Sequence, residues 1–286
     1  MALNSQTGAG IIVPESVGPL IVDPLKAAST AIAISTNVST SSPSFRIPIV
    51  AADPAGGWYA EGSDISLTDA EIAEINVVPK KMAVLSKISN ELANDSSPAA
   101  AQVIGEGMSR SIARKLDAAF FGNTVANGPS GLLSLSDVST VAGGDLTDLD
   151  PFAEAISALE AIGCEATAFV ASATDTLHLQ TLKAFDGATQ SNQPLLSPAG
   201  DATSATKRQI LGVPLYTVPD GVVEDGTIWA LDRSRSFVVM RQDVQLEVDR
   251  SVYFASDSVG IRAIIRVAFG FPTEPAICKI TWGASS

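Results

Sequence analysis

Residues 97–123 read SPAAAQVIGEGMSRSIARKLDAAFFGN, and this stretch predicts one long helix around which the rest of the chain can be placed. Pro98 suits a first helical position, since its missing N–H would have no partner there, and Ser97 is the expected cap. Apolar side chains then recur every four residues, at Ile104, Met108, Ile112, Leu116 and Phe120. Gly122 and Asn123 predict a left-handed stop. At about 1.5 Å per residue the helix is roughly 36 Å long.

The opposite side of this helix is polar. Arg110, Arg114, Lys115 and Asp117 fall there, so the spacing predicts a basic face. The chain as a whole is acidic, with a net charge of −13 over 286 residues, which argues against tight, sequence-independent binding of nucleic acid. Apolar residues make up 46% and charged residues 17%, a folded composition long enough for about two domains. No stretch resembles a signal peptide or a membrane span.

Residues 1–45 do not resemble a domain. Prolines interrupt the first 24 residues, and a tract rich in serine and threonine follows Lys26. Such a segment cannot bury a core of its own. We expect an extended arm that lies over a neighbouring subunit.

Residues 46–88 predict a long hairpin. One strand begins with FRIPIV at residues 45–50, and the return strand spans 75–88. Between residues 47 and 79 there is no Lys or Arg, while six acids occur. Because a lone hairpin of this length is marginal in water, we expect it to rest on another subunit; an active-site lid is the alternative.

The remainder predicts an α/β unit followed by strands. A helix begins at Asp150 and ends at Gly163, a buried strand spans 166–171, and Ser172 caps a further helix through Leu182. Residues 187–205 predict a surface loop. Strands are expected at 210–218, 227–231, 237–240, 244–248, 258–271 and 276–280.

Signals for catalysis or metal binding are scarce. His178 is the only histidine and is expected to be a packed or surface residue. Cys164 and Cys278 match no metal spacing and predict buried thiols, with a disulfide left open. The acids at 145, 148 and 150 fit a helix entry better than a cation site. We therefore predict no enzyme, no cofactor and no metal, although abundant carboxylates leave a hydrolase with a hairpin lid as an alternative.

The order of the pieces resembles the major capsid proteins of tailed bacteriophages with the HK97-type fold. The matching stretches are IIVPE at 11–15, FRIP at 45–48, GWYAEG at 57–62, PKKMA at 79–83, SNELANDS at 89–96, IARKLDAAFFG at 112–122, LGVPL at 211–215 and PAI at 275–277. Each motif is weak alone, but their order is specific. An encapsulin, a cellular compartment of the same architecture, is the nearest alternative.

The resemblance implies an α+β, HK97-like fold with four parts. These are an N-terminal arm (1–45), an extended hairpin loop (46–88), a peripheral domain (89–142 and 236–266, with spine helix 97–122) and an axial domain (143–235 and 267–286). The family often begins with a removable helical scaffold, whereas the arm starts almost at once here, so a separate scaffold or none is expected. Ile264 and Ile265 stand where self-cross-linking members carry a glutamate, so no autocatalytic cross-link is expected.

The resemblance also implies a structural role in a virion capsid assembled in the host cytoplasm. The partners are further copies, as pentamers and hexamers, with portal, scaffolding or decoration proteins left open. Double-stranded DNA is enclosed without sequence-specific binding, and no membrane is involved. The candidate contacts between subunits are Trp58, Tyr59, Glu61, Asp64, Glu71, Lys80, Lys81, Arg110, Arg114 and Lys115. From their charges, we expect the acidic hairpin of one subunit to lie across Arg110, Arg114 or Lys115 of a neighbour, with Trp58 or Tyr59 as an apolar anchor.

Overall fold

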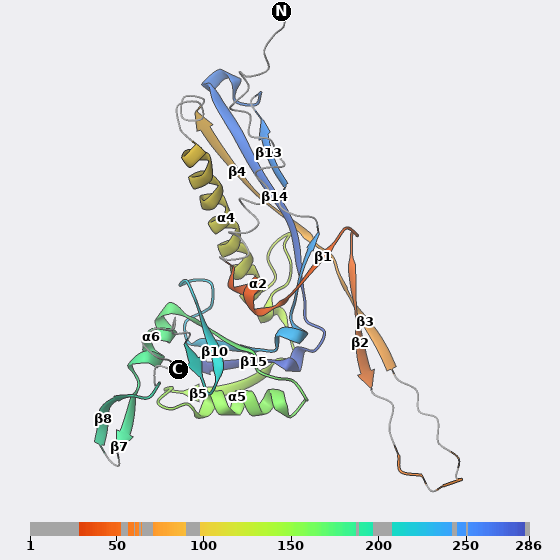
Figure 1. Ribbon diagram of the computed structural model, residues 1–286, viewed down its shortest axis with the longest axis vertical. Helices are drawn as coiled ribbons and strands as arrows, with labels where there is room; N and C mark the ends of the chain where they lie inside the picture. The colour runs from red at the N-terminus through yellow and green to blue at the C-terminus, as the bar shows by residue number, and fades with distance from the viewer. Residues whose placement is uncertain are drawn as a thin grey trace, which may run out of the picture.

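A computed structural model describes residues 29–52, 57–59, 61–62, 64, 71–89, 98–186, 189–196, 208–241, 245–249 and 251–283. The predicted cap Ser97 and residues 1–28 of the predicted arm lie outside this range. The molecule is elongated (Figure 1): one lobe holds α4 beside long strands, a second lobe holds α5 and α6, and the β2–β3 hairpin projects away from both.

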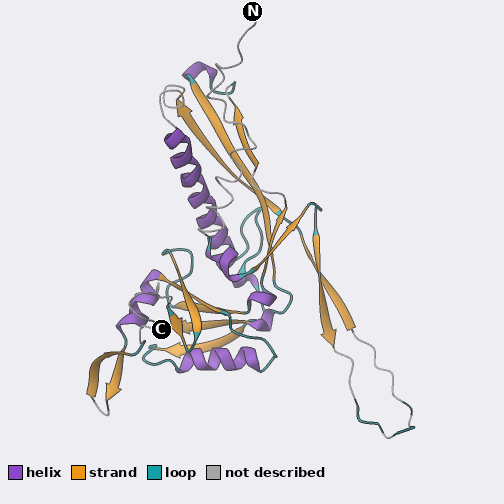
Figure 2. Ribbon diagram, in the orientation of Figure 1, coloured by secondary structure: helices purple, strands orange, loops and turns teal. Residues whose placement is uncertain are grey.

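The long helix is confirmed as α4 (Pro98–Phe121), and it covers one face of a sheet. Among the described residues this sheet has five strands, in the order β1-β12-β14-β13 with β4 also paired to β14. Their bounds are β1 (Thr36–Thr40), β4 (Lys80–Ser89), β12 (Phe237–Arg241), β13 (Gln245–Asp249) and β14 (Ser258–Gly270). We call α4 with this sheet the α4 lobe (Figure 2). The predicted left-handed stop is wrong, because neither Gly122 nor Asn123 has a positive φ.

The predicted hairpin is confirmed only in its outer part. β2 (Phe45–Ala52) pairs antiparallel with β3 (Glu71–Val77), with Ile47 opposite Ile75. The predicted return strand 75–88 is two strands, because it breaks at residues 78–79 and β4 then joins β14 in the α4 lobe. Pro79 has no N–H to donate to a neighbouring strand, which favours a break at this point.

The second lobe is built on another sheet, which among the described residues has six strands in the order β5-β15-β11-β6-β10-β9. Its elements are β5 (Ser139–Gly144), α5 (Asp150–Glu160), β6 (Ala168–Ser172), α6 (Ala173–Thr181), β9 (Gln209–Ile210), β10 (Val213–Val218), β11 (Thr227–Leu231) and β15 (Ile277–Trp282). Short 3₁₀ turns lie at Leu132–Ser134 (η1), Arg233–Arg235 (η2), Phe254–Ser256 (η3) and Glu274–Ala276 (η4). We call this part the six-strand lobe.

Part of the predicted loop 187–205 is a strand. β8 (Thr189–Pro194) pairs with β7 (Lys183–Asp186) in a small hairpin that extends from the six-strand lobe (Figure 1). Two strands also cross the predicted domain boundaries: β14 continues to Gly270, and β5 begins at Ser139.

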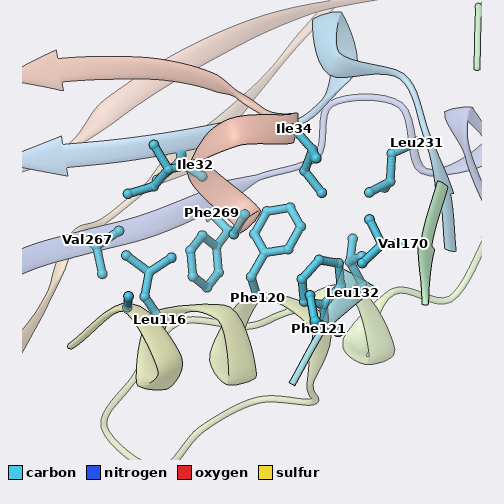
Figure 3. Close-up of a cluster of buried hydrophobic side chains, with 14 of the residues drawn as sticks. Ile32, Ile34, Leu116, Phe120, Phe121, Leu132, Val170, Leu231, Val267 and Phe269 are labelled. Carbon is cyan, nitrogen blue, oxygen red and sulfur yellow. The ribbon is translucent and has the colours of Figure 1, made fainter. Parts of the chain in front are cut away.

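One hydrophobic core joins the two lobes (Figure 3). Phe120 and Phe121 of α4 pack with Phe269 of β14 on one side, and with Val170 and Leu231 of the six-strand lobe on the other. Phe120 makes edge-to-face contacts with three phenylalanines, at centroid distances of 5.1 Å to Phe121, 5.0 Å to Phe269 and 5.4 Å to Phe271. The lobes are therefore packed against each other through a common interior.

Residues 29–40 belong to the body of the subunit, which corrects the prediction that they are part of an extended arm. α2 (Thr30–Ile34) buries Ala31, Ile32 and Ile34 in the common core, and β1 pairs in parallel with β12. Asp117 was predicted on the polar side of the long helix, but it is 3% exposed. Its carboxylate accepts hydrogen bonds from Ser29 Oγ (2.6 Å), Thr30 N (3.0 Å) and Ala31 N (3.0 Å), so it holds the start of α2 on α4.

Replacing Asp117 with Ala is expected to destabilise the subunit, by about 1–3 kcal/mol at neutral pH, because buried donors lose their acceptor. Burial raises the pKa of Asp117, although its three hydrogen bonds act the other way. A native carboxyl with a raised pKa binds a proton before the unfolded chain does as the pH falls, so protonation adds to the stability that Asp117 provides at acid pH. This added part is lost as the pH rises through the native pKa, and the contribution of the hydrogen bonds to the carboxylate remains.

Urea unfolding of the unassembled subunit checks this dependence. The stability difference between the wild type and Asp117→Ala should increase from about pH 7 to about pH 4.5, above the ordinary carboxyl pKa. Ser111→Ala, on the exposed side of the same helix, is the control and should change little at either pH. A difference that shrinks on acidification contradicts the prediction.

Candidate interaction surfaces

The hairpin presents an apolar and acidic surface. Trp58 is fully exposed, and Glu61, Asp64 and Ile72 are also exposed, while Tyr59 keeps part of its ring in solvent. Glu71 is the first residue of β3. Exposed aromatic side chains among polar groups are typical of sites where proteins contact one another.

A single ion pair links the two described strands of this hairpin. Arg46 Nη1 lies 3.0 Å from Glu74 Oε1, and both side chains are more than half exposed. An exposed pair of this kind contributes only about 0–1 kcal/mol, so it does little to change the acidic character of the hairpin.

The exposed face of α4 carries the predicted basic residues. Arg114 and Lys115 are exposed, and Arg110 lies 3.8 Å from Glu106, one helical turn before it. The structure therefore brings these three cations together on the side of α4 that faces away from its sheet.

A second basic surface lies on the other side of the same lobe. Along β4 the partly buried Met82 and Val84 pack into the core beneath α4, whereas Lys81, Leu85 and Lys87 alternate with them and are exposed. In the register with β14, Lys81 is opposite Arg266 and Leu85 is opposite Arg262. Lys80, the remaining predicted contact residue, is exposed at the start of β4.

Two cations of this surface have local partners, and one of these partners is an acid. Arg262 is ion-paired with Glu247 of β13, and the Lys87 ammonium lies 5.1 Å from the centre of the Tyr253 ring. The sequence did not identify four residues of this surface as candidates for contact with another subunit: Leu85, Lys87, Arg262 and Arg266. The alternation along residues 80–89 indicated which side chains of β4 share a face, but not that β14 would be their neighbour.

Two titratable side chains of the six-strand lobe, the buried Asp175 and the half-buried His178, have structural partners. Asp175 accepts hydrogen bonds from the backbone N–H of Gly226 at 3.1 and 3.2 Å, and burial raises its pKa. His178 stacks on Trp282 with centroids 4.5 Å apart, and its Nε2 lies 3.3 Å from the carbonyl oxygen of Leu146. The lone histidine is therefore a packed residue, one of the two roles expected for it.

The two cysteines are free and buried. Burial raises the pKa of the Cys278 thiol to about 11, so this group stays protonated at neutral pH and is a poor nucleophile. The acids near residue 150 form a helix entry, since the backbone N–H of Asp150 donates to Asp148 Oδ1 at 3.1 Å. Within the described ranges, no three His, Cys, Asp or Glu side chains are grouped so that they could hold a metal ion.

In the part of the chain that the structure describes, no helix has both the length and the apolar character needed to cross a membrane. The model of the phage capsid family matches residues 9–282 of the chain. A comparison with curated proteins finds no match.

Solved structures with the same fold cover nearly all of the chain. The capsid of an empty GTA particle is 21% identical and covers 99% of this chain and 95% of its own, with a TM-score of 0.71. A structure from Microbacterium phage Oxtober96 is 22% identical and covers 98% of this chain and 96% of its own, with a TM-score of 0.70. A structure from Mycobacterium phage Bobi is 17% identical and covers 100% of this chain and 96% of its own, with a TM-score of 0.71. At these identities the likeness establishes the fold.

Proposed function

The chain belongs to the phage capsid family and is a major capsid protein of the virion shell, and we propose that its copies close as pentamers and hexamers into an icosahedral shell around double-stranded DNA. The observation that carries this proposal is the family match over residues 9–282, which includes every described element. The HK97-type α+β fold expected from the order of the pieces is confirmed by the matching capsid structures.

The two lobes correspond to the proposed domains. The α4 lobe forms the peripheral domain, and the six-strand lobe forms most of the axial domain, which meets its copies around the five-fold and six-fold centres. What supports this division is the separation of the strands into two sheets, with α4 on one and α5 and α6 with the other. Adjacent axial domains then carry like charge, because acids outnumber Lys and Arg in residues 143–235.

The hairpin is the proposed contact between neighbouring copies. Its acidic residues Glu61, Asp64 and Glu71 lie across Arg110, Arg114 or Lys115 of the next subunit, with Trp58 or Tyr59 as the apolar anchor. Lys80 and Lys81 are further candidate contact residues. Charge complementarity supports this arrangement, but exposed ion pairs contribute only about 0–1 kcal/mol each, so burial of the aromatic ring supplies most of the affinity. Contacts summed over a subunit should exceed roughly 2,000 Å².

The remaining parts of the proposal follow from composition and from the family. The protein acts as a structural component, without catalysis, cofactor or metal, and it assembles in the host cytoplasm. DNA is enclosed without sequence-specific binding, which suits a chain with a net charge of −13. Portal, scaffolding or decoration proteins are further partners of such a shell.

Electron microscopy of the purified protein tests the proposal. Closed shells or rings of five and six subunits are expected. A population that remains monomeric under all assembly conditions rejects the proposal and favours the hydrolase alternative. Closed shells that copurify with an enzyme cargo in place of nucleic acid would instead identify an encapsulin.

A further inference from the structure

Among the described residues, a small hydrophobic cluster packs the hairpin against the α4 lobe. Ile47 of β2 and Val77 of β3 are 5% and 4% exposed, and they pack on Val239 of β12 and Ala268 of β14. These four residues, the root contact, form a cluster separate from the common core of the two lobes. The rest of the described hairpin extends away from the body (Figure 1).

The covalent connections to the hairpin are short. Residues 41–44 join β1 to β2, and residues 78–79 join β3 to β4. Both connections enter at the same end of the hairpin, so the chain alone does not fix the angle at which the hairpin leaves the body. The packing of the hairpin on the sheet beneath it must then set that angle, and Ile47 and Val77 are its most buried members, with Phe45 and Ile75 partly buried beside them.

Gly270 lies directly under this packing. A Cβ at position 270 would lie 2.5 Å from Ile47 Cδ1 and 3.1 Å from Val77 Cγ2, both closer than ordinary van der Waals contact. Gly270 ends β14 and is not among the residues with positive φ, so its backbone would accept other amino acids. The requirement at this position is therefore space for the two hairpin side chains.

We propose that Gly270 is a positioning residue for assembly: by lacking a side chain, it lets Ile47 and Val77 pack on β14 and so sets the direction of the hairpin. This inference rests on the proposed function, in which the hairpin contacts a second copy of the chain. The eight residues of β2 span about 26 Å, so a tilt of roughly 10° at the root moves the outer end by about 4–5 Å. A displacement of that size removes Trp58 from a specific contact.

The direction of the hairpin is measured in the unassembled subunit with spin labels at Glu61→Cys and Ser111→Cys, both exposed positions. Cys164 and Cys278 are buried and stay unlabelled. The label-to-label distance should shift by several ångströms in Gly270→Val and less in Gly270→Ala. Ile47→Val removes the Cδ1 atom that meets the new Cβ, so the double variant Gly270→Ala/Ile47→Val should return to the wild-type distance.

Gly260→Ala is the matched control. It adds the same methyl group to the same face of β14, where its Cβ meets the Tyr253 ring at 3.1 Å instead of the hairpin. Its label distance and its shells should be those of the wild type. Circular dichroism verifies that each variant is folded. If Gly270→Val does not fold, the comparison of Gly270→Ala with Gly270→Ala/Ile47→Val tests the proposal instead.

Assembly of the same Gly270 and Ile47 variants, without the labelling substitutions, is then followed by electron microscopy. Variants with a larger shift in the label-to-label distance should give fewer closed shells. The yield should recover in the double variant Gly270→Ala/Ile47→Val. An unchanged distance in a folded Gly270→Val, or a shift that Ile47→Val does not reverse, overturns the proposal. Wild-type subunits that never assemble refute the proposed function instead, and the distances in the free subunit still decide whether Gly270 positions the hairpin.

Discussion

Replacing Trp58 with Ala is expected to abolish shell formation while the subunit stays folded. Trp58 is fully exposed in the isolated subunit, so its removal leaves no cavity in either lobe. In the proposed shell the ring is the apolar anchor between neighbours, and truncation of such an anchor typically costs about 2–4 kcal/mol at each contact. Because every subunit contributes one hairpin, this loss is repeated throughout the shell. Sedimentation and electron microscopy under assembly conditions measure the outcome.

Trp58→Phe is the control, since it keeps an aromatic ring and should retain most assembly. Unfolding curves of the unassembled variants should match that of the wild type. Normal shells from Trp58→Ala would refute the role of the ring as an anchor.

A charge exchange locates the surface that the hairpin covers. Arg114→Glu with Lys115→Glu should weaken assembly, and adding Glu61→Lys with Asp64→Lys should restore it if the hairpin lies on α4. If the hairpin instead lies on the basic surface of β4 and β14, Lys81→Glu with Arg266→Glu should weaken assembly. Adding Glu61→Lys with Asp64→Lys should then restore it. The two results assign the contact to one side of the α4 lobe.

Phe120→Ala is expected to have the largest effect on stability, a loss of about 3–5 kcal/mol in the free energy of unfolding. The side chain is 0% exposed and makes three edge-to-face contacts, each worth about 0.5–1.5 kcal/mol beyond its buried area. Arg114→Ala, on the exposed side of the same helix, should stay within about 0.5 kcal/mol of the wild type.

Urea unfolding of the unassembled subunit measures this loss with two probes. Trp229 is buried in the six-strand lobe and contributes to the common core, so its fluorescence should report the same transition as the circular dichroism of the whole chain. A loss below about 1 kcal/mol, or a fluorescence transition unaffected by the substitution, would show that Phe120 does not link the lobes.

The elements that the sequence predicts well are those with a local signal. Neighbouring residues alone give three such signals: the apolar recurrence every four residues along α4, the proline at the start of α4, and the alternation along β4. Pro79 is also a local signal, because a proline within an apparent strand argues for a break. The prediction of one strand over 75–88 is wrong at this residue.

Contacts between distant segments had no such signal. Asp117 fits a polar helix position by spacing, and its burial depends on Ser29, 88 residues earlier in the chain. The same holds for the candidate surfaces. Alternation predicts that Lys81 is exposed, but its place beside Arg266 depends on the register between β4 and β14. Glycine at 270 has no local explanation, because the side chains that require it come from two strands far away in sequence.

The core shared by α4, β14 and the six-strand lobe has a mechanical consequence. In a shell with both five-membered and six-membered rings, chemically identical subunits must fit different local curvatures. Bending a subunit between its lobes would open the packing around Phe120 and Phe121, which is costly because protein interiors are close-packed. We therefore expect the two lobes to keep one fixed arrangement in the proposed shell, and the difference in curvature to be accommodated at the contacts between subunits.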